Sequence, residues 1–254
     1  MRYLELQKLF RKSVSSTTTR IPSGVLGFDN LVYGGFREHS VNVIIADPGC
    51  GKSTFCWQYC SNEPQKPALF VSLEQSLGSI LRDCNDIGLE KFKRKFEAGV
   101  LQFQVAFNVD SELTSGEIGL RFFMNELPKY LEVIKETALQ HPGGLRIAID
   151  PLTPLLLEIT NPNQQRNAIN RIFSSLREIG TSVVTIEKGF GDVLARIPLF
   201  LSDSIIGLEH IGLGGIYNRT LSVKKFRGSN HSESPQPMGF QKDRGLLIYD
   251  ISHK

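Results

Sequence analysis

The sequence predicts an α/β fold with a mainly parallel central sheet flanked by helices and with antiparallel strands at its C-terminal end. Short apolar runs rich in Val, Ile and Phe alternate with longer segments of helical period, which is the pattern of strand–helix–strand units. A length of 254 residues and a hydrophobic content of 41% suit one large α/β domain. We therefore expect a single domain over residues 1–254, with residues 1–19 as an N-terminal extension.

The expected parallel strands are VNVIIA (41–46), ALFVSL (68–73), VLQFQVA (100–106), LRIAID (145–150) and TSVVTIE (181–187). The segments between them carry apolar residues near i, i+3 and i+4 spacing, as helices packed on a sheet require. These residues are Phe55 and Tyr59 after the first strand, Ile80, Leu81, Cys84 and Ile87 after the second, and Leu120, Phe123, Met124, Leu127, Leu131 and Ile134 before the fourth.

The C-terminal part of the chain has a different pattern. Its strand-like runs are SDSIIGLEHI (202–211), TLSVKKF (220–226) and GLLIYD (245–250), separated by Gly, Asn and Pro with no room for helices. We expect these runs to extend the sheet in antiparallel fashion. The polar stretch RGSNHSESPQP (227–237) predicts a mobile loop.

Composition narrows the functional classes. The 29 basic and 26 acidic side chains leave a net charge of +3, which does not favour a general nucleic-acid binder. The four cysteines form no C-x-x-C pair, and Cys56 and Cys60 are expected to be buried thiols on one helix face. The start MRYLELQKLFRK is interrupted by charges, and no apolar run approaches the ~20 residues of a membrane span. We expect a cytoplasmic, reduced protein without a membrane span.

A phosphate-binding loop follows the first long strand. The segment ADPGCGKST (46–54) fits G-x-x-x-x-G-K-[ST], except that Ala46 stands at the first glycine. It lies between a strand and a helix, so backbone N–H groups and the helix N-terminus can bind a polyphosphate. Lys52 would reach the β and γ phosphates, and the Ser53 hydroxyl would hold Mg²⁺. The nucleotide-binding residues are expected to be Asp47, Pro48, Gly49, Cys50, Gly51, Lys52, Ser53 and Thr54.

Carboxylates at other strand ends complete the expected site. Asp150 ends the run RIAID and is the candidate second Mg²⁺ contact, although an Asp at this place is by itself more often a cap or turn residue. Glu74 follows the second strand and is the candidate catalytic carboxylate that orients water; the alternative is a helix-opening Glu near the dipole. Glu187 ends the strand TSVVTIE and could sense the γ-phosphate. In open α/β sheets, all of these side chains would face one crevice.

These motifs resemble the KaiC-like branch of the RecA-superfamily ATPases, which is related to RadA recombinases. The resemblance begins at RIPSGVLGFDNLVYGG and continues through the loop at 46–54, FVSLEQS, LRIAIDPLTPLL and LREIGTSVVTIE. It closes with FLSDSIIGLEHI and with VKKFRGSNH, which is similar to the Lys-x-Arg-Gly-[ST]-x-His stretch of KaiC-like domains. The resemblance covers nearly the whole chain and implies a RecA-like P-loop fold.

The resemblance also implies that ATP is bound between adjacent subunits of a ring, usually a hexamer. Lys225 and Arg227 would then reach the neighbour's γ-phosphate as a trans finger, whereas without the resemblance they are a solvated basic strand end. Gln75 replaces the second carboxylate of the family's Glu-Glu pair, which leaves Glu74 as the candidate base. Leu199 and Phe200 stand where KaiC carries its Ser-Thr phosphoacceptor pair, which disfavours autophosphorylation, although Ser202 and Ser204 lie close.

The leading hypothesis is a slow, Mg²⁺-dependent ATPase that forms a homo-oligomeric ring and acts on an unidentified protein partner as a regulatory or signalling switch. One alternative is a nucleotide-binding scaffold that hardly turns over, similar to the RecA-like subunit of the archaeal motility motor. Another is a RadA-like, DNA-dependent ATPase, which the modest charge and the short segment KGFGDVLARIP after Glu187 disfavour.

Overall fold

The computed structural model describes residues 19–106, 117, 120–141, 144–189, 192–210 and 219–249; the expected N-terminal extension lies outside them up to residue 18. The elements are β1 (Arg20–Ile21), α2 (Phe28–Leu31), β2 (Phe36–Arg37), β3 (Val41–Ala46), α3 (Lys52–Ser61), β4 (Ala68–Ser72), α4 (Leu77–Asp86), α5 (Glu90–Glu97), β5 (Leu101–Val105), a π-helical turn η1 (Phe122–Glu126), α7 (Leu127–Leu139), β6 (Leu145–Asp150), α8 (Thr153–Glu158), α9 (Pro162–Ile179), β7 (Gly180–Glu187), α10 (Asp192–Leu201), β8 (Ser204–His210), β9 (Arg219–Phe226), β10 (Gln236–Gln241) and β11 (Gly245–Ile248).

A nine-stranded sheet organises the molecule, in the order β11-β10-β9-β8-β3-β7-β6-β4-β5. The strands from β8 to β5 in this order pair in parallel, whereas β9, β10 and β11 pair antiparallel at one end. The expected mainly parallel sheet with antiparallel C-terminal strands is therefore confirmed. A separate two-stranded ribbon joins β1 to β2.

Two details of the C-terminal prediction are wrong. The run 202–211 was expected in the antiparallel extension, but β8 pairs in parallel with β3, from Asn42↔Ser204 to Ala46↔Leu208. The reason is that helix α10 precedes it and provides the crossover that parallel strands need. The polar stretch 227–237 was expected to be a loop throughout, but β10 begins at Gln236, whose side chain is buried.

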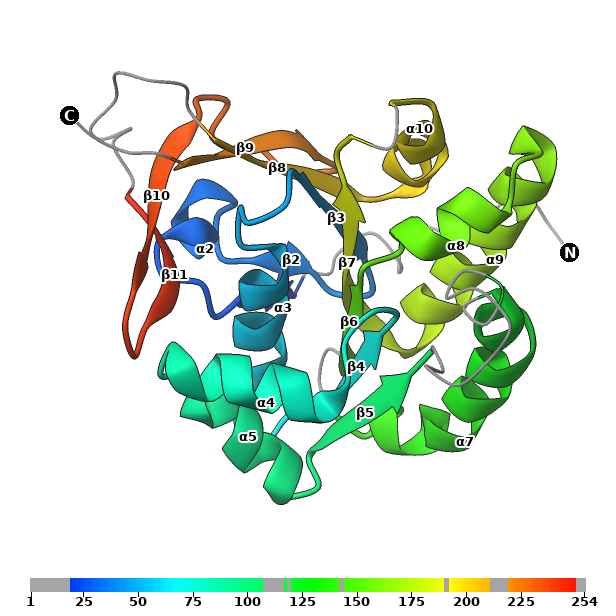
Figure 1. Ribbon diagram of the computed structural model, residues 1–254, viewed down its shortest axis with the longest axis horizontal. Coiled ribbons are helices and arrows are strands. Elements are labelled where there is room, and N and C mark those ends of the chain that lie inside the picture. The colour runs from blue at the N-terminus through cyan, green and yellow to red at the C-terminus, as the bar shows by residue number, and fades with distance from the viewer. Residues whose placement is uncertain are drawn as a thin grey trace, which may run out of the picture.

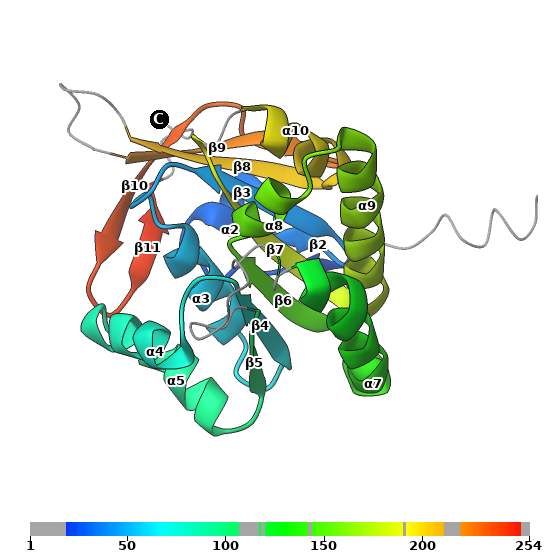
Figure 2. The same cartoon turned by 45° about the vertical axis from the view of Figure 1, so that its right-hand side comes forward.

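Helices cover both faces of the sheet (Figure 1). On one face α3, α4 and α5 enclose a core that includes Phe55, Phe70 and Phe92. On the other face η1, α7, α8 and α9 enclose a core that includes Phe123 and Phe173. Figure 2 shows α9 running along the side of the sheet opposite α3. The antiparallel strands curl toward α3, so that Leu246 of β11 joins the core of the α3 side.

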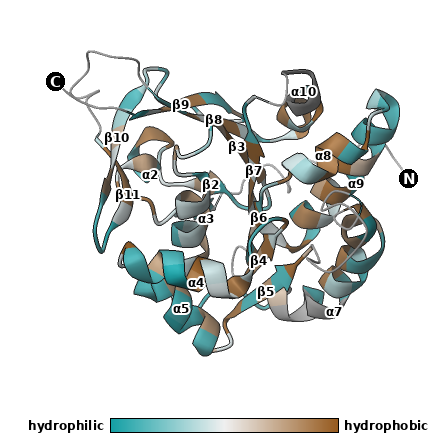
Figure 3. Ribbon diagram, viewed as in Figure 1, coloured by the Kyte–Doolittle hydropathy of each residue, from teal (hydrophilic) through white to brown (hydrophobic). Residues whose placement is uncertain are grey.

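The strands alternate between these two cores because successive side chains on a strand point to opposite faces. In β3, Val41 and Val43 face the α9 side, whereas Ile44 and Ala46 face the α3 side. Figure 3 shows the hydrophobic residues concentrated along the sheet and hydrophilic ones on the outward faces of α4, α5 and α9. Within the part of the chain that the structure describes, no helix is long and apolar enough to cross a membrane.

Candidate functional site

The loop between β3 and α3 has the conformation that its glycines predict. Gly49 has φ 75° and Gly51 has φ 106°, both in the left-handed region that favours glycine. A Cβ on Gly49 would meet nothing within 4 Å, so the loop is open at this point. Ala46, at the position of the motif's first glycine, lies in β3 without a positive φ and is buried, which explains why alanine is accepted there.

The ammonium group of Lys52 lies inside the loop that it follows. Its side chain is buried, and Nζ donates to the carbonyl oxygens of Ala46 and Asp47, each at 3.1 Å. Neither acceptor carries a charge, and no carboxylate forms an ion pair with Lys52 among the described residues. A buried ammonium held only by carbonyl groups leaves its charge available to an anion at the loop.

Asp150 lies at the end of β6, beside the start of α3. It is 6% exposed, and its carboxylate accepts a hydrogen bond from the Thr185 hydroxyl and one from the Ser53 hydroxyl. Burial raises the pKa of Asp150, and these hydrogen bonds and the charge of Lys52 act against the rise. The carboxylate therefore lies within hydrogen-bond reach of the hydroxyl that was predicted to hold Mg²⁺.

Glu74 and Glu187 lie at the same edge of the sheet. Glu74 follows β4 and is exposed, whereas Glu187 ends β7, and its backbone N–H donates to the Thr153 hydroxyl at 2.9 Å. Although the residue as a whole is exposed, the protein around its carboxyl group removes part of the solvent and raises the pKa of Glu74, and the negative charges of Glu187 and Asp150 raise it further. The carboxylates are therefore close enough to influence one another, with Lys52 as the opposing charge.

Strand register explains why these groups meet. Ala46 pairs with Glu187, Ser72 pairs with Asp150, and Ile149 pairs with Val184, so these strands end within about two residues of one another. Alternation along β6 places Asp150 on the same face as Ala148, which belongs to the core on the α3 side. Glu74 lies four residues after Phe70, and Glu187 lies four residues after Val183. Phe70 and Val183 belong to the same core, and an even spacing in an extended chain places both glutamates on that face. The carboxylates thus lie on the face and at the edge where α3 begins.

Lys225 and Arg227 lie at the opposite edge of the sheet. Lys225 pairs with Ile205 at the start of β8, and Arg227 donates its backbone N–H to Asp203 at 2.9 Å. The Lys225 ammonium donates to carbonyl oxygens at the end of α10, those of Leu199 at 2.9 Å, Phe200 at 3.2 Å and Ser202 at 2.6 Å. Within one subunit these cations therefore cap a helix rather than face the loop at 46–54.

The hydroxyl and aromatic groups near α10 are arranged as follows. Phe200 is 70% exposed, whereas Ser202 and Ser204 are buried. The Ser202 hydroxyl donates to the Leu199 carbonyl at 2.8 Å, and the Ser204 hydroxyl donates to Asn42 at 2.7 Å. Both serine hydroxyls thus have internal partners.

Gln75 donates its backbone N–H to Ser72 at 2.9 Å.

The sequence analysis did not identify the hydroxyl groups that form hydrogen bonds with the acidic residues at the carboxyl ends of the strands. Thr185 donates to Asp150, and Thr153 accepts from the backbone of Glu187. The signal for Thr185 was present, because a polar residue inside an apolar strand, two positions before Glu187, shares the face of Glu187. Phe240, which lies beside Gly51, and Arg219, which lies over the Phe240 ring, come from distant strands and carry no local motif.

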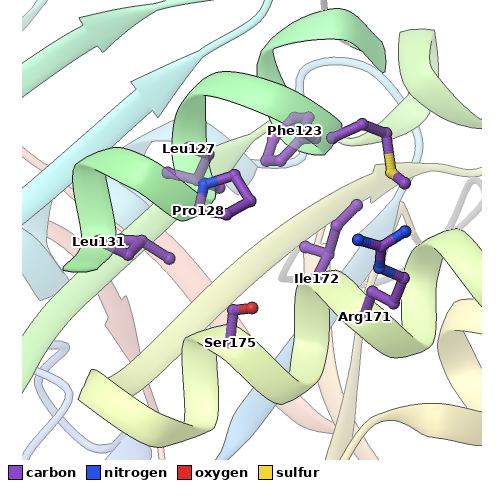
Figure 4. A pocket seen from close by; sticks show the side chains of 8 residues that line it. Phe123, Leu127, Pro128, Leu131, Arg171, Ile172 and Ser175 are labelled. Carbon is purple, nitrogen blue, oxygen red and sulfur yellow. The ribbon is translucent and has the colours of Figure 1, made fainter.

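A small pocket elsewhere does not contribute to this site. Figure 4 shows Phe123, Leu127 and Leu131 of η1 and α7 facing Ile172 of α9, with Arg171 beside them. Its apolar lining belongs to the core on the α9 side, away from the face on which α3 and the carboxylates lie. The free cysteines are all buried, as expected for Cys56 and Cys60.

Comparisons with known proteins agree with this geometry. A family model described as "ATPase: KaiC" matches residues 21–253. Among curated relatives, the circadian clock protein KaiC2 of Synechocystis is 26% identical over 245 residues, 94% of this chain and 42% of that protein. A UPF0273 protein of Aeropyrum pernix is 28% identical over 246 residues, 91% of this chain and 93% of that protein. The chain thus spans about half the length of the KaiC relatives, 42% and 48% for the first two.

A solved structure resembles the fold. The KaiC-like protein of the hyperthermophilic archaeon Pyrococcus horikoshii has a TM-score of 0.70 and 23% sequence identity. The match covers 92% of this chain and 100% of the other. It supports the RecA-like architecture, with a large, mostly parallel sheet flanked by helices.

Proposed function

The chain belongs to the KaiC family of ATPases, and on that premise we propose that it binds Mg²⁺-ATP at the loop 46–54 and hydrolyses it slowly. The observation that carries the proposal is the convergence of Lys52, Ser53, Asp150 and Glu74 on one face and one edge of the sheet. We further propose that the protein works in the cytoplasm as a ring whose geometry follows its nucleotide state, and that it acts on a protein partner.

The residues at the loop fit a nucleotide and its metal ion. The buried Lys52 ammonium with only carbonyl partners and the open space at Gly49 suit a polyphosphate at the N-terminus of α3. Ser53 and Asp150 offer the oxygen donors that Mg²⁺ prefers, and a site with few carboxylates is usual where phosphates supply the other ligands. When bound, Mg²⁺ would neutralise charge on the β and γ phosphates.

Each side chain has a distinct role in this proposal. Lys52 would attract the β and γ phosphates, and Thr185 would orient the Asp150 carboxylate toward Ser53 through its hydrogen bond. Glu74 would orient the attacking water and accept its proton, and its raised pKa makes the carboxylate a stronger base than an ordinary glutamate. Glu187 would contact the γ-phosphate side of the same crevice.

A ring would bring Lys225 and Arg227 of one subunit to the loop of the next. Support for this assignment comes from their position at the sheet edge opposite the loop, where they serve no nucleotide of their own subunit. Arg227 is the better candidate for the γ-phosphate, because its side chain is 51% exposed and donates to one carbonyl group, that of Phe200 at 3.0 Å, with Asp203 at 3.7 Å, whereas Lys225 donates to three carbonyl groups at the end of α10. A guanidinium in trans would neutralise charge in the transition state.

The first test compares phosphate release by the wild type, Lys52→Ala and Glu74→Gln. Lys52→Ala is expected to lose ATP binding, because it removes the cation inside the loop. Glu74→Gln is expected to bind ATP as the wild type does but to lose hydrolysis by at least about 10²-fold, the typical contribution of a general base. Equal rates in all three proteins would refute the ATPase assignment.

Each of the two alternative functions predicts a different experimental result. Tight ATP binding in isothermal titration, together with undetectable turnover, would favour the non-hydrolysing scaffold. Stimulation of hydrolysis by single-stranded DNA that weakens with added salt would favour the RadA-like motor. The presence of Glu74 beside Lys52 supports hydrolysis over the scaffold.

A further inference from the structure

An aromatic ring from a distant strand lies against the phosphate-binding loop. Phe240 of β10 approaches Gly51 so closely that a Cβ on Gly51 would lie 2.7 Å from the ring carbon Cζ. Glycine at this position therefore leaves room for the Phe240 ring, and it also allows the left-handed backbone conformation with φ 106°. Phe240 is 42% exposed, so much of its surface faces outward at the loop.

A cation lies over the same ring. The Arg219 guanidinium carbon is 5.1 Å from the centroid of Phe240, within cation–π distance. Arg219 pairs with His210 at the end of β8 and with Met238 of β10, so it lies at the sheet edge where the loop begins. Burial raises the pKa of the Cys50 thiol within the loop, and the positive charges of Lys52 and Arg219 oppose that rise.

The guanidinium has unused hydrogen-bonding capacity. Its Nε is buried and has no hydrogen-bond partner among the residues that the structure describes. No described carboxylate forms an ion pair with Arg219, in contrast to Arg177, which pairs with Asp203 at 2.9 Å. The charge of Arg219 is therefore not neutralised by a described carboxylate, and the guanidinium remains over the Phe240 ring beside the loop.

We propose that Phe240 and Arg219 form a stacking platform for the base of the nucleotide whose phosphates occupy the loop 46–54. The inference rests on the proposed function and extends it to nucleotide choice. Stacking accepts any base, because every base has a π-face, and selectivity requires hydrogen bonds to the base edge. The platform is thus a base-tolerant contact, suited to ATP and GTP alike.

The test measures the binding of Mg²⁺-ATP, Mg²⁺-GTP and Mg²⁺-tripolyphosphate by titration calorimetry. Phe240→Leu is expected to weaken ATP and GTP roughly ten-fold each, within the range known for base–aromatic stacking, and to leave tripolyphosphate unchanged. Phe240→Tyr should keep wild-type affinity, since it keeps the ring. In the wild type, ATP and GTP are expected to bind within about three-fold of each other, as stacking alone would give.

Tyr249→Leu is the matched control. Tyr249 is 41% exposed and lies against Gly239, the neighbour of Phe240, so it occupies the opposite face of β10. Its loss should leave all three affinities unchanged. A variant Phe240→Trp adds a spectroscopic readout: its fluorescence should be quenched by ATP and unaffected by tripolyphosphate.

The outcomes separate this inference from the proposed function. If the wild type binds neither ATP nor tripolyphosphate, the proposed function is wrong. If the wild type binds both but Phe240→Leu weakens them equally, the ring only supports the loop, and the platform is wrong. A Phe240→Leu variant with wild-type affinity for ATP, or a wild type that prefers one base by more than about ten-fold, would likewise overturn the platform.

Discussion

At the residue scale, the molecule gathers carboxylates around one buried lysine. Asp150 and Glu74 both have raised pKa values because burial disfavours their charged forms, and the charge of Lys52 acts against both shifts. For Asp150, the folded state therefore holds its proton more strongly than the unfolded chain does. The free energy of unfolding should fall as pH rises from the ordinary value of 3.8 toward the raised pKa of the folded state.

The pH dependence of hydrolysis tests the coupling between Glu74 and Glu187. Glu74 must be ionised to act as a base, so kcat/KM should decline as pH falls through its pKa, at a midpoint above the ordinary 4.5. Glu187→Gln removes a negative charge that raises this pKa, so the midpoint should move to lower pH. Glu97→Gln on α5, whose carboxylate pairs with Lys93, is the control and should leave the midpoint in place. An unmoved midpoint in Glu187→Gln would contradict the coupling.

At the scale of elements, the ends of the helices are fixed by specific side chains. Helix α9 begins after Asn161, whose side-chain oxygen accepts from the N–H groups of Asn163 at 3.0 Å and Gln164 at 3.1 Å. At the other end of the fold, the Lys225 ammonium holds the last carbonyls of α10. Since α9 packs on β7, the Asn161 cap helps to position the strand that ends at Glu187.

Loss of the hydrogen bonds that cap α9 should lower the free energy of unfolding by a measurable amount. Asn161→Ala leaves two N–H groups without their acceptor, and the free energy of unfolding should fall by about 1 kcal/mol. Asn163→Ala is the matched control, because only the backbone N–H of Asn163 takes part in the cap. Urea denaturation compares the two variants with the wild type. Equal midpoints for both variants would show that the cap contributes nothing.

At the scale of the whole molecule, the loop and the candidate trans residues lie at opposite edges of the sheet. Strand β3, Val41–Ala46, separates the two edges by about 20 Å at roughly 3.3 Å per residue. Arg227 of a subunit therefore lies too far from its own loop to contact a phosphate there. The proposed ring would bring the two edges together, because head-to-tail contacts place the opposite edges of neighbouring subunits against each other.

Mixing of inactive subunits tests this arrangement. Lys52→Ala keeps Arg227, and Arg227→Ala keeps the loop, so each variant alone should be inactive if the site lies between subunits. A 1:1 mixture should recover about a quarter of the wild-type rate, because a quarter of randomly formed interfaces combine an intact loop with an intact arginine. Phosphate release from the mixture, compared with the separate proteins, gives the measurement. A mixture as inactive as its components would contradict the trans role.

The sequence by itself determined most strands of the large sheet and the loop between β3 and α3. VNVIIA followed by ADPGCGKST predicts a strand, a phosphate-binding turn and a helix, because apolar period, glycine freedom and the helix N-terminus are local properties. It misplaced β8, since strand direction depends on the crossover through α10 and not on the residues of the strand. Only the tertiary structure decided which distant groups meet: Thr185 at Asp150, Phe240 at Gly51, Arg219 over Phe240, and Lys225 at the end of α10. These contacts depend on register and sheet order, which long-range packing fixes.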